Sequence, residues 1–205
     1  MRKSIVIPFD AEPPLPDAVS PPPPDLGLPK RGRLWVFGYG SLMWDPGFEF
    51  QCMRPAMLYG YHRAFCVWSH HYRGTVARPG LVLGLSPGGS CRGLAFRVSA
   101  DHRDAVVDYL YRREMLTGVY VPRLLRVLVP EGVVTALAFT ADRDHGQFAG
   151  RLTEAKTAAV IAGAHGRRGP NRDYLAQTVR HLDELGIKDG ALHRLLARVV
   201  ARKPG

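Results

Sequence analysis

The sequence predicts an α+β domain whose sheet is largely antiparallel and could close into a barrel. Short runs rich in Val, Leu and aromatic residues alternate with Gly, Pro and Ser from residue 34 to residue 141, a pattern typical of strands joined by turns. The last third of the chain instead shows helical spacing of its apolar residues. Strands followed by helices are typical of the α+β class. With 205 residues, 46% of them hydrophobic, the chain can bury the core of one ordinary domain but hardly of two.

Six apolar runs predict the strands of this sheet. They cover residues 34–42, 56–69, 81–87, 91–99, 122–130 and 133–141. Between the third and the fourth run, Pro87 precedes Gly88 and Gly89, which favour a tight turn, so we expect a hairpin there. The same stretch contains the G-x-S-x-G pattern of hydrolases, but that motif requires a helix after its serine. Because another strand follows, Ser86 is not expected to be a nucleophile.

Four segments have the composition and spacing of helices. Residues 101–115 contain neither proline nor glycine and place Val106 and Leu110 one turn apart, which predicts a helix between two strands. Three more helices are predicted in the last third: an alanine-rich one over residues 153–164, one that Asn171 caps and Gly186 ends, and one that Asp189 caps. One helix is thus inserted among the strands, and the other three follow the sheet.

Residues 1–30 are predicted to form a proline-rich N-terminal extension, and we expect the folded domain to occupy residues 31–205. Residues 11–30 lack a periodic apolar face, which predicts an extended or disordered segment. No apolar run approaches the roughly 20 residues that span a bilayer, and the one at residues 5–8 is too short for a secretory signal. We therefore expect a cytoplasmic protein that has no membrane partner.

The positive charge of the chain is dispersed. The formal net charge is +10, but the chain contains no block of five or more basic residues and no aromatic interleaving of the kind that stacks bases. This favours a solvated basic surface over a nucleic-acid interface, and it suits an anionic small-molecule substrate. The three cysteines show no C-x-x-C spacing, and the adjacent His70 and His71 would point to opposite faces of a strand, so no metal site is predicted.

Two features are candidates for a functional site. The segment Gly38–Leu42 follows the first strand, and its glycines allow a tight turn whose N–H groups can face a ligand, although an ordinary turn explains them equally well. Glu114 is in helical phase with Val106 and Leu110, which places a carboxylate on the core-facing side of the predicted helix. Such a carboxylate is either paired with a nearby arginine or suited to general acid/base catalysis. The spacing leaves both interpretations of Glu114 open.

Seven motifs resemble those of the ChaC-like gamma-glutamylcyclotransferases, in the order of that family, from about Leu34 to about Leu185. They are Trp35–Leu42, Gly60-Tyr61 with Arg63 and Phe65, His71–Gly74, Arg78–Gly80, Gly93–Arg97, Tyr109-Leu110 with Arg113-Glu114, and Gly169–Asn171 with Tyr174-Leu175. Each motif alone is a weak signal, whereas seven in register are a strong one.

The resemblance implies a gamma-glutamylcyclotransferase-like fold, which is a small, mostly antiparallel β-barrel with flanking helices. It also implies that Glu114 is the catalytic acid/base, and that the gamma-glutamyl group is held by Tyr39, Gly40, Ser41 and Leu42 at the barrel mouth. Arg73 and Tyr174 match further motif positions and are expected to line the pocket. The implied enzyme is a carbon–nitrogen lyase that converts glutathione to 5-oxoproline and Cys-Gly without a cofactor.

Two alternatives stay open at this point. The segment Leu116–Tyr120 follows Glu114 where many glutathione-specific members have a compact Gly-Gly-Tyr, so gamma-glutamyl amino acids or amines are other candidate substrates. The second alternative is a non-enzymatic regulator or binding protein, in line with the historical link of family names to cation transport. A pure binding protein has no need of both Glu114 and the complete Tyr39–Leu42 loop, which argues against this alternative.

Overall fold

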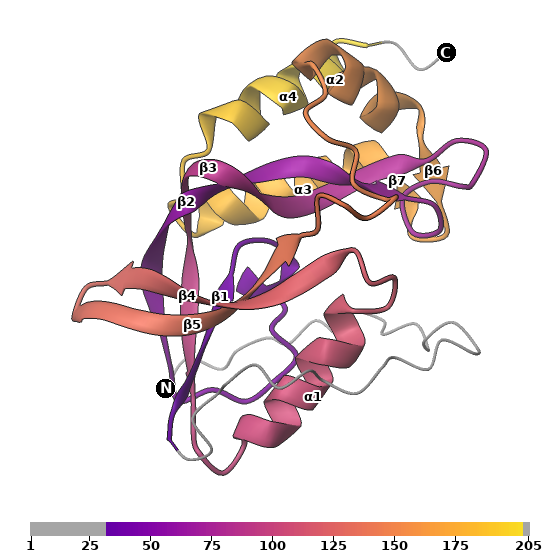
Figure 1. The fold of residues 1–205 in the computed structure, drawn as a ribbon. Helices are drawn as coiled ribbons and strands as arrows, with labels where there is room; N and C mark the ends of the chain where they lie inside the picture. Colours follow the sequence, from indigo (N-terminus) through magenta and orange to yellow (C-terminus); the bar gives the residue numbers. More distant parts are fainter. Residues whose placement is uncertain (1–31, 203–205) are drawn as a thin grey trace.

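The five long strands close into a barrel that has helices on two sides (Figure 1). The computed structural model describes residues 32–202, so the predicted extension over residues 1–30 lies outside the described residues. The strand order around the barrel is β1, β3, β2, β4, β5, with bounds β1 Leu34–Gly38, β2 Cys52–Ser69, β3 Gly80–Val98, β4 Tyr120–Val129 and β5 Gly132–Ala141. Neighbouring strands are antiparallel except for β1 and β5. The predicted α+β fold with a mostly antiparallel barrel is confirmed.

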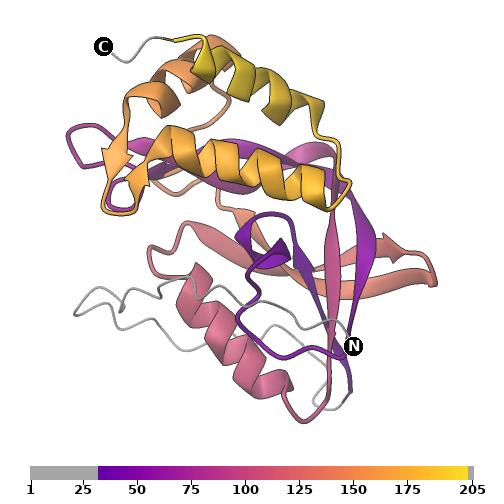
Figure 2. The same ribbon diagram turned by 180° about the vertical axis from the view of Figure 1, so that it is seen from behind.

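One helix lies beside the barrel, and three others form a separate layer (Figures 1 and 2). The first is α1, Arg103–Glu114, and the layer consists of α2 Glu154–Gly163, α3 Asn171–Glu184 and α4 Gly190–Val200. The short helix η1, Ser41–Met43, follows β1, and the small strands β6, His165–Gly166, and β7, Gly169–Pro170, precede α3. All four predicted helices are confirmed close to their predicted bounds. No helix within residues 32–202 is long and apolar enough to cross a membrane.

The predicted hairpin at Pro87–Gly89 is wrong, because the third and fourth predicted strands form one continuous strand, β3. Gly88 and Gly89 have positive φ angles, as does Gly60 on the facing strand β2. The register between β2 and β3 shifts beside these glycines, as it does at a β-bulge. The glycines therefore bend a long two-stranded ladder instead of reversing the chain, and this ladder reaches from the barrel to the helical layer (Figure 1).

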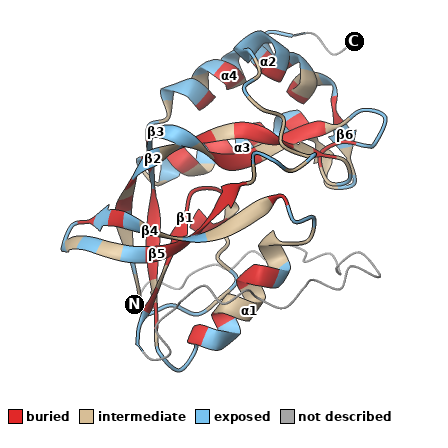
Figure 3. Ribbon diagram, viewed as in Figure 1, coloured by how far each residue is buried: buried red, intermediate tan, exposed pale blue. Residues whose placement is uncertain are grey.

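One hydrophobic core runs from the barrel into the helical layer (Figure 3). Its largest fully buried side chains include Phe37, Phe96 and Leu137 of the barrel, Leu110 of α1, and Ile161, Leu175 and Leu182 of the layer. Burying one such side chain contributes about 1.5–3 kcal/mol to folding. Because the layer shares the core of the barrel, side chains of α3 have a fixed position relative to the barrel.

The start of α3 differs from the prediction. Pro170 is the N-cap residue, whereas the predicted cap, Asn171, is completely buried. The Asn171 side chain donates from Nδ2 to the Leu81 carbonyl (2.8 Å) and accepts at Oδ1 from the Leu81 N–H (2.7 Å). It thus joins the helix to β3 in the way that the backbone of a neighbouring strand would. Asp189 does cap α4 as predicted, since its Oδ1 accepts from the Leu192 N–H (3.2 Å).

Candidate functional site

The loop after β1 is packed closely against the barrel. A Cβ atom on Gly93 would lie 2.2 Å from the carbonyl oxygen of Gly38, so only glycine lets β3 approach the end of β1 in this way. A Cβ atom on Gly38 would in turn lie 3.2 Å from Cβ of Leu42. The chain therefore folds back at once after β1 and enters η1. This brings the Tyr39–Leu42 loop over the end of the barrel.

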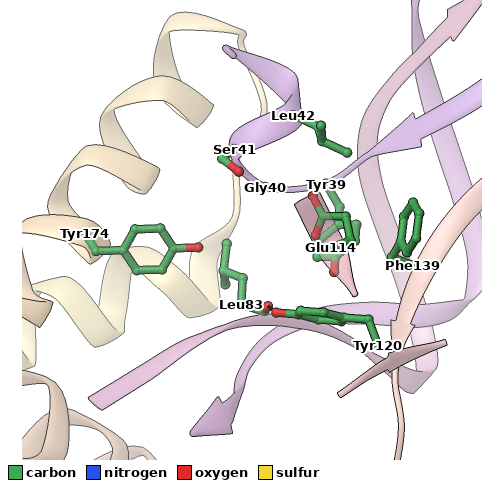
Figure 4. Close-up of a pocket in the computed structure, with 9 residues that line it drawn as sticks. All are labelled: Tyr39, Gly40, Ser41, Leu42, Leu83, Glu114, Tyr120, Phe139 and Tyr174. Carbon is green, nitrogen blue, oxygen red and sulfur yellow. Dashed lines mark hydrogen bonds between the residues drawn. The ribbon is translucent and has the colours of Figure 1, made fainter. Parts of the chain in front are cut away.

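The loop forms one wall of a pocket that contains most of the predicted site (Figure 4). The pocket holds about 400 Å³ of empty space, part of it open to solvent, and is lined by Tyr39, Gly40, Ser41, Leu42, Leu83, Glu114, Tyr120, Phe139 and Tyr174. Six of the seven predicted site residues are among them. The lining comes from the loop, from strands β3, β4 and β5, and from helices α1 and α3. The pocket therefore depends on both the barrel and the helical layer.

Arg73 is the predicted site residue that the structure places outside the pocket lining. Its guanidinium carbon lies 5.1 Å from the ring centroid of Tyr174, in a cation–π contact. The side chain also donates from Nη1 to the Arg168 carbonyl, and the backbone N–H of Arg73 donates to Ser69 Oγ (3.0 Å). Arg73 thus supports one lining residue from behind.

Glu114 is the last residue of α1, and 18% of its side chain is exposed. Leu110 and Val106 are buried one and two turns earlier, respectively, on the same face, which confirms the predicted helical phase. Burial raises the pKa of the Glu114 carboxyl, and the Arg113 guanidinium, whose Nε lies 3.5 Å from Glu114 Oε1, opposes that rise. The C-terminal end of the helix macrodipole also disfavours a negative charge here. The arginine partner considered in the sequence is thus present, and it also donates to Ser41 Oγ in the pocket wall (3.1 Å).

Three tyrosines surround the carboxylate of Glu114. Burial raises the pKa of Tyr174 to about 12 and that of Tyr39 and Tyr120 well above the ordinary value, and the charge of Glu114 adds to all three shifts. All three phenols are therefore neutral at physiological pH and can donate hydrogen bonds. Tyr120 uses its hydroxyl to donate to the Leu83 carbonyl (2.6 Å). Figure 4 shows the Tyr174 hydroxyl directed into the pocket from the α3 side, opposite Glu114.

Leu83, Tyr120 and Phe139 line the pocket but were not predicted as site residues. The alternation of side chains along a strand can place Leu83 and Phe139 on the inner face, but it does not tell which end of the barrel they reach. Tyr120 had a usable signal, since it ends the segment that directly follows Glu114.

The arrangement is suited to moving a proton on a small polar ligand. Glu114 is a carboxylate of raised pKa, and the loop, Tyr39 and Tyr174 offer neutral hydrogen-bond donors around it. Among residues 32–202, no group of three or more His, Cys, Asp and Glu side chains is placed to hold a metal ion. Proton transfer is a chemistry that Glu114 and the donors around it can supply.

Comparisons with known proteins find relatives over most of the chain. The family model described as ChaC-like protein matches residues 34–202. A protein of Escherichia coli K12 named glutathione-specific gamma-glutamylcyclotransferase is 37% identical over 172 residues, which cover 83% of this chain and 74% of that protein. A Schizosaccharomyces pombe protein of the same name is 31% identical over 203 residues, which cover 86% of this chain and 96% of that protein.

A solved structure shares the fold. The crystal structure of a gamma-glutamylcyclotransferase specific to glutathione from yeast matches with a TM-score of 0.74 and 26% sequence identity. The match covers 82% of this chain and 96% of the yeast chain. The similarity in structure therefore extends over nearly the same share of the chain as the similarity in sequence.

Proposed function

The chain belongs to the ChaC-like family, and from this membership we propose that it degrades glutathione as a glutathione-specific gamma-glutamylcyclotransferase. The relatives from E. coli and S. pombe carry that name, and the matching yeast structure is described as specific to glutathione. The observation that carries the proposal is that Glu114 and the Tyr39–Leu42 loop open into one pocket.

In the proposed reaction the substrate supplies its own nucleophile. The α-amine attacks the γ-carbonyl carbon, a new C–N bond closes a five-membered ring, and the amide bond to the cysteine nitrogen breaks. The products are 5-oxoproline and Cys-Gly. Because the nucleophile and the leaving group belong to one molecule, the pocket has to hold the flexible γ-glutamyl chain in a bent conformation. The substrate then loses its conformational entropy when it binds and not when it reaches the transition state.

Glu114 is the proposed acid and base. Two protons leave the α-ammonium nitrogen as it becomes the lactam N–H, and two reach the departing nitrogen as it becomes the ammonium of Cys-Gly. A single carboxylate that alternately accepts and donates a proton balances both changes. A raised pKa suits this role, because the carboxylate must give up its proton as readily as it takes one.

The remaining lining residues are proposed to bind the γ-glutamyl group. Backbone N–H groups of Tyr39, Gly40 and Leu42 and the hydroxyl of Ser41 are candidate donors to the α-carboxylate or to the oxyanion formed at the γ-carbon. Tyr174 faces the same space, and Arg73 is proposed to support Tyr174 through its cation–π contact. We also propose a cytoplasmic protein whose site contains no metal or cofactor and which does not bind nucleic acid.

An end-product assay tests the function directly. The purified protein is incubated in parallel with glutathione, with a γ-glutamyl amino acid and with a γ-glutamyl amine, and 5-oxoproline and Cys-Gly are quantified. We expect equal amounts of 5-oxoproline and Cys-Gly from glutathione and little 5-oxoproline from the other two substrates. Preferential turnover of the other substrates would favour the alternative linked to the Leu116–Tyr120 segment. Absence of turnover on all three would contradict an enzymatic role.

A further inference from the structure

Arg113 connects α1 to the loop that lines the pocket. Its Nη1 donates to the Tyr109 hydroxyl (2.8 Å) and to the carbonyls of Asp45 (2.9 Å) and Pro46 (3.4 Å), and its Nη2 donates to Ser41 Oγ (3.1 Å). Its Nε faces Glu114. A guanidinium presents its donors in a rigid planar fork, so these contacts fix several groups relative to one another at once.

Residues 41–47, which continue from the pocket loop, pack closely on α1. At Gly47 there is no room for a side chain. This residue has a φ of +68°, and a Cβ atom there would lie 1.9 Å from the Tyr109 hydroxyl and 3.4 Å from Arg113 Nη1. Both the conformation and the close approach require glycine. The contact between α1 and residues 41–47 is therefore a tight, specific fit around the Tyr109 and Arg113 side chains.

We propose that Arg113 is a positioning residue, which holds the Tyr39–Leu42 loop in register with the end of α1 that carries Glu114. This inference rests on the proposed function. Because Ser41 Oγ accepts a hydrogen bond from Arg113, the hydroxyl proton of Ser41 is free to be donated to the substrate. Arg113 thereby sets both the location of the base and the donor role of Ser41, which lines the same pocket.

Arg113 also affects the pKa of Glu114. The groups that face this carboxyl are Arg113 on α1, Tyr39 in the loop, Tyr120 on β4 and Tyr174 on α3, and Arg113 is the cation among them. Its charge lowers the pKa of Glu114 against the effect of burial. Without Arg113, burial and the helix terminus would act unopposed, and the carboxylate would take up a proton at a higher pH.

Two substitutions separate the positioning effect from the charge effect, and a neighbouring residue supplies the control. Arg113→Gln removes the charge and most of the donors, whereas Arg113→Lys keeps the charge but not the planar fork. Arg112 precedes Arg113 on the outside of the helix, with 67% of its side chain exposed and an ion pair to Asp108 (2.7 Å). Arg112→Gln therefore removes the same charge from the same turn of α1 without touching the loop.

The assay is 5-oxoproline release as a function of pH and glutathione concentration, with thermal melting of every variant. For Arg113→Gln we expect kcat to fall by about 10²-fold, as misplacement of a catalytic group by about 1 Å can cause, and the acid limb of the pH–rate profile to move to higher pH. Arg113→Lys should lower kcat but leave the acid limb near that of the unmodified protein. Arg112→Gln should change neither.

The outcomes are distinguishable. If the unmodified protein and Arg112→Gln release no 5-oxoproline, the proposed function fails and the role of Arg113 fails with it. If both are active and Arg113→Gln matches them in kcat and in the acid limb, only the role of Arg113 is refuted. If Arg113→Gln does not fold, Arg113→Lys decides, since unchanged kcat in that variant refutes positioning. Infrared titration of the carboxyl band, assigned with Glu114→Gln, checks the shift without substrate.

Discussion

The guanidinium of Arg63 lies 2.9 Å from the carboxylate of Asp189, although the two residues belong to β2 and to the N-cap of α4. Only 2% of the Arg63 side chain is exposed. Its other nitrogens donate to the carbonyl of Tyr39 and to that of Arg92 (2.7 Å). One buried cation thus links the first turn of α4 to the loop that lines the pocket.

Asp189→Asn should destabilise the domain by about 3–5 kcal/mol, because it leaves the buried charge of Arg63 without its counter-ion. Asparagine caps helices as well as aspartate does, so the loss reports the ion pair and not the start of α4. Urea unfolding measures the effect. Glu131→Gln is the matched control, because it neutralises the partner of the exposed Arg54 and should leave the unfolding midpoint nearly unchanged. Equal midpoints for the two variants would contradict the prediction.

Glu114→Gln should abolish cyclotransfer and leave the fold and some glutathione binding in place. The amide keeps the shape of the side chain but cannot accept the proton of the substrate ammonium, so we expect a rate loss of about 10²–10⁴-fold. Arg113 retains four neutral acceptors in this variant, so the melting temperature should change little.

The control for this experiment is Glu49→Gln, since the Glu49 side chain is 83% exposed. 5-Oxoproline release and thermal melting are measured on both variants. A well-folded Glu114→Gln protein that turns over normally would show that Glu114 is only a structural partner of Arg113. A large fall in melting temperature together with only a small loss of 5-oxoproline release would lead to the same conclusion.

His193 should stabilise the protein at acidic pH and lose that effect as the pH rises. Its Nδ1 lies 2.7 Å from the Asp189 carbonyl and its Nε2 lies 2.9 Å from Asp183 Oδ1, and both partners are acceptors, so both ring nitrogens must be protonated. The bond to the Asp189 carbonyl and the neighbouring carboxylates raise the pKa of His193.

Because the pKa is higher in the folded state, the contribution of His193 is complete below the unfolded value of about 6.5 and disappears as the pH rises through the folded value. Unfolding of His193→Gln and of the unmodified protein is compared at about pH 5.5 and about pH 8.5. We expect the difference in midpoint to be larger at the lower pH. A difference in unfolding midpoint that is the same at both pH values would refute the stabilising role of protonated His193.

Removal of residues 1–30 should leave melting temperature and turnover nearly unchanged. The sequence of this stretch is dominated by proline and offers no periodic apolar face with which to join a core. Full-length and shortened proteins are compared by thermal melting and by 5-oxoproline release. A large fall in melting temperature would show that the stretch packs on the domain.

Local patterns predicted most of the elements and the phase of the key carboxylate, because both depend on residues close in sequence. The helical spacing of Val106, Leu110 and Glu114 is an example, since burial of the first two fixes the side on which the third lies. The same reasoning failed at Gly88 and Gly89, because a pair of glycines suits a hairpin and a bulge equally well. The bulge is recognisable only from Gly60 on the partner strand.

Features that depend on distant residues could not be predicted. Asn171 is a good N-cap residue by type, but its side chain binds Leu81, which is 90 positions earlier in the chain. Nothing in the sequence separates Arg113 from its neighbour Arg112, since only the folded loop gives one of them acceptors. Arg73 was expected in the pocket because it matches a family motif, which does not show whether a residue lines a pocket or supports it.

The way in which the barrel closes determines when the chain becomes competent for catalysis. β1 and β5 share two register pairs, Trp35 with Ala136 and Val36 with Leu137, and these partners lie about 100 positions apart in the sequence. We expect this pairing to form late in folding, because closing a loop of that length costs conformational entropy before the contact stabilises the chain. The loop after β1, Glu114 and the walls from β4 and β5 face one another only in the closed barrel. A nascent or partly unfolded chain can therefore contain α1 and Glu114 without the pocket, and activity should arise in one step when the barrel closes.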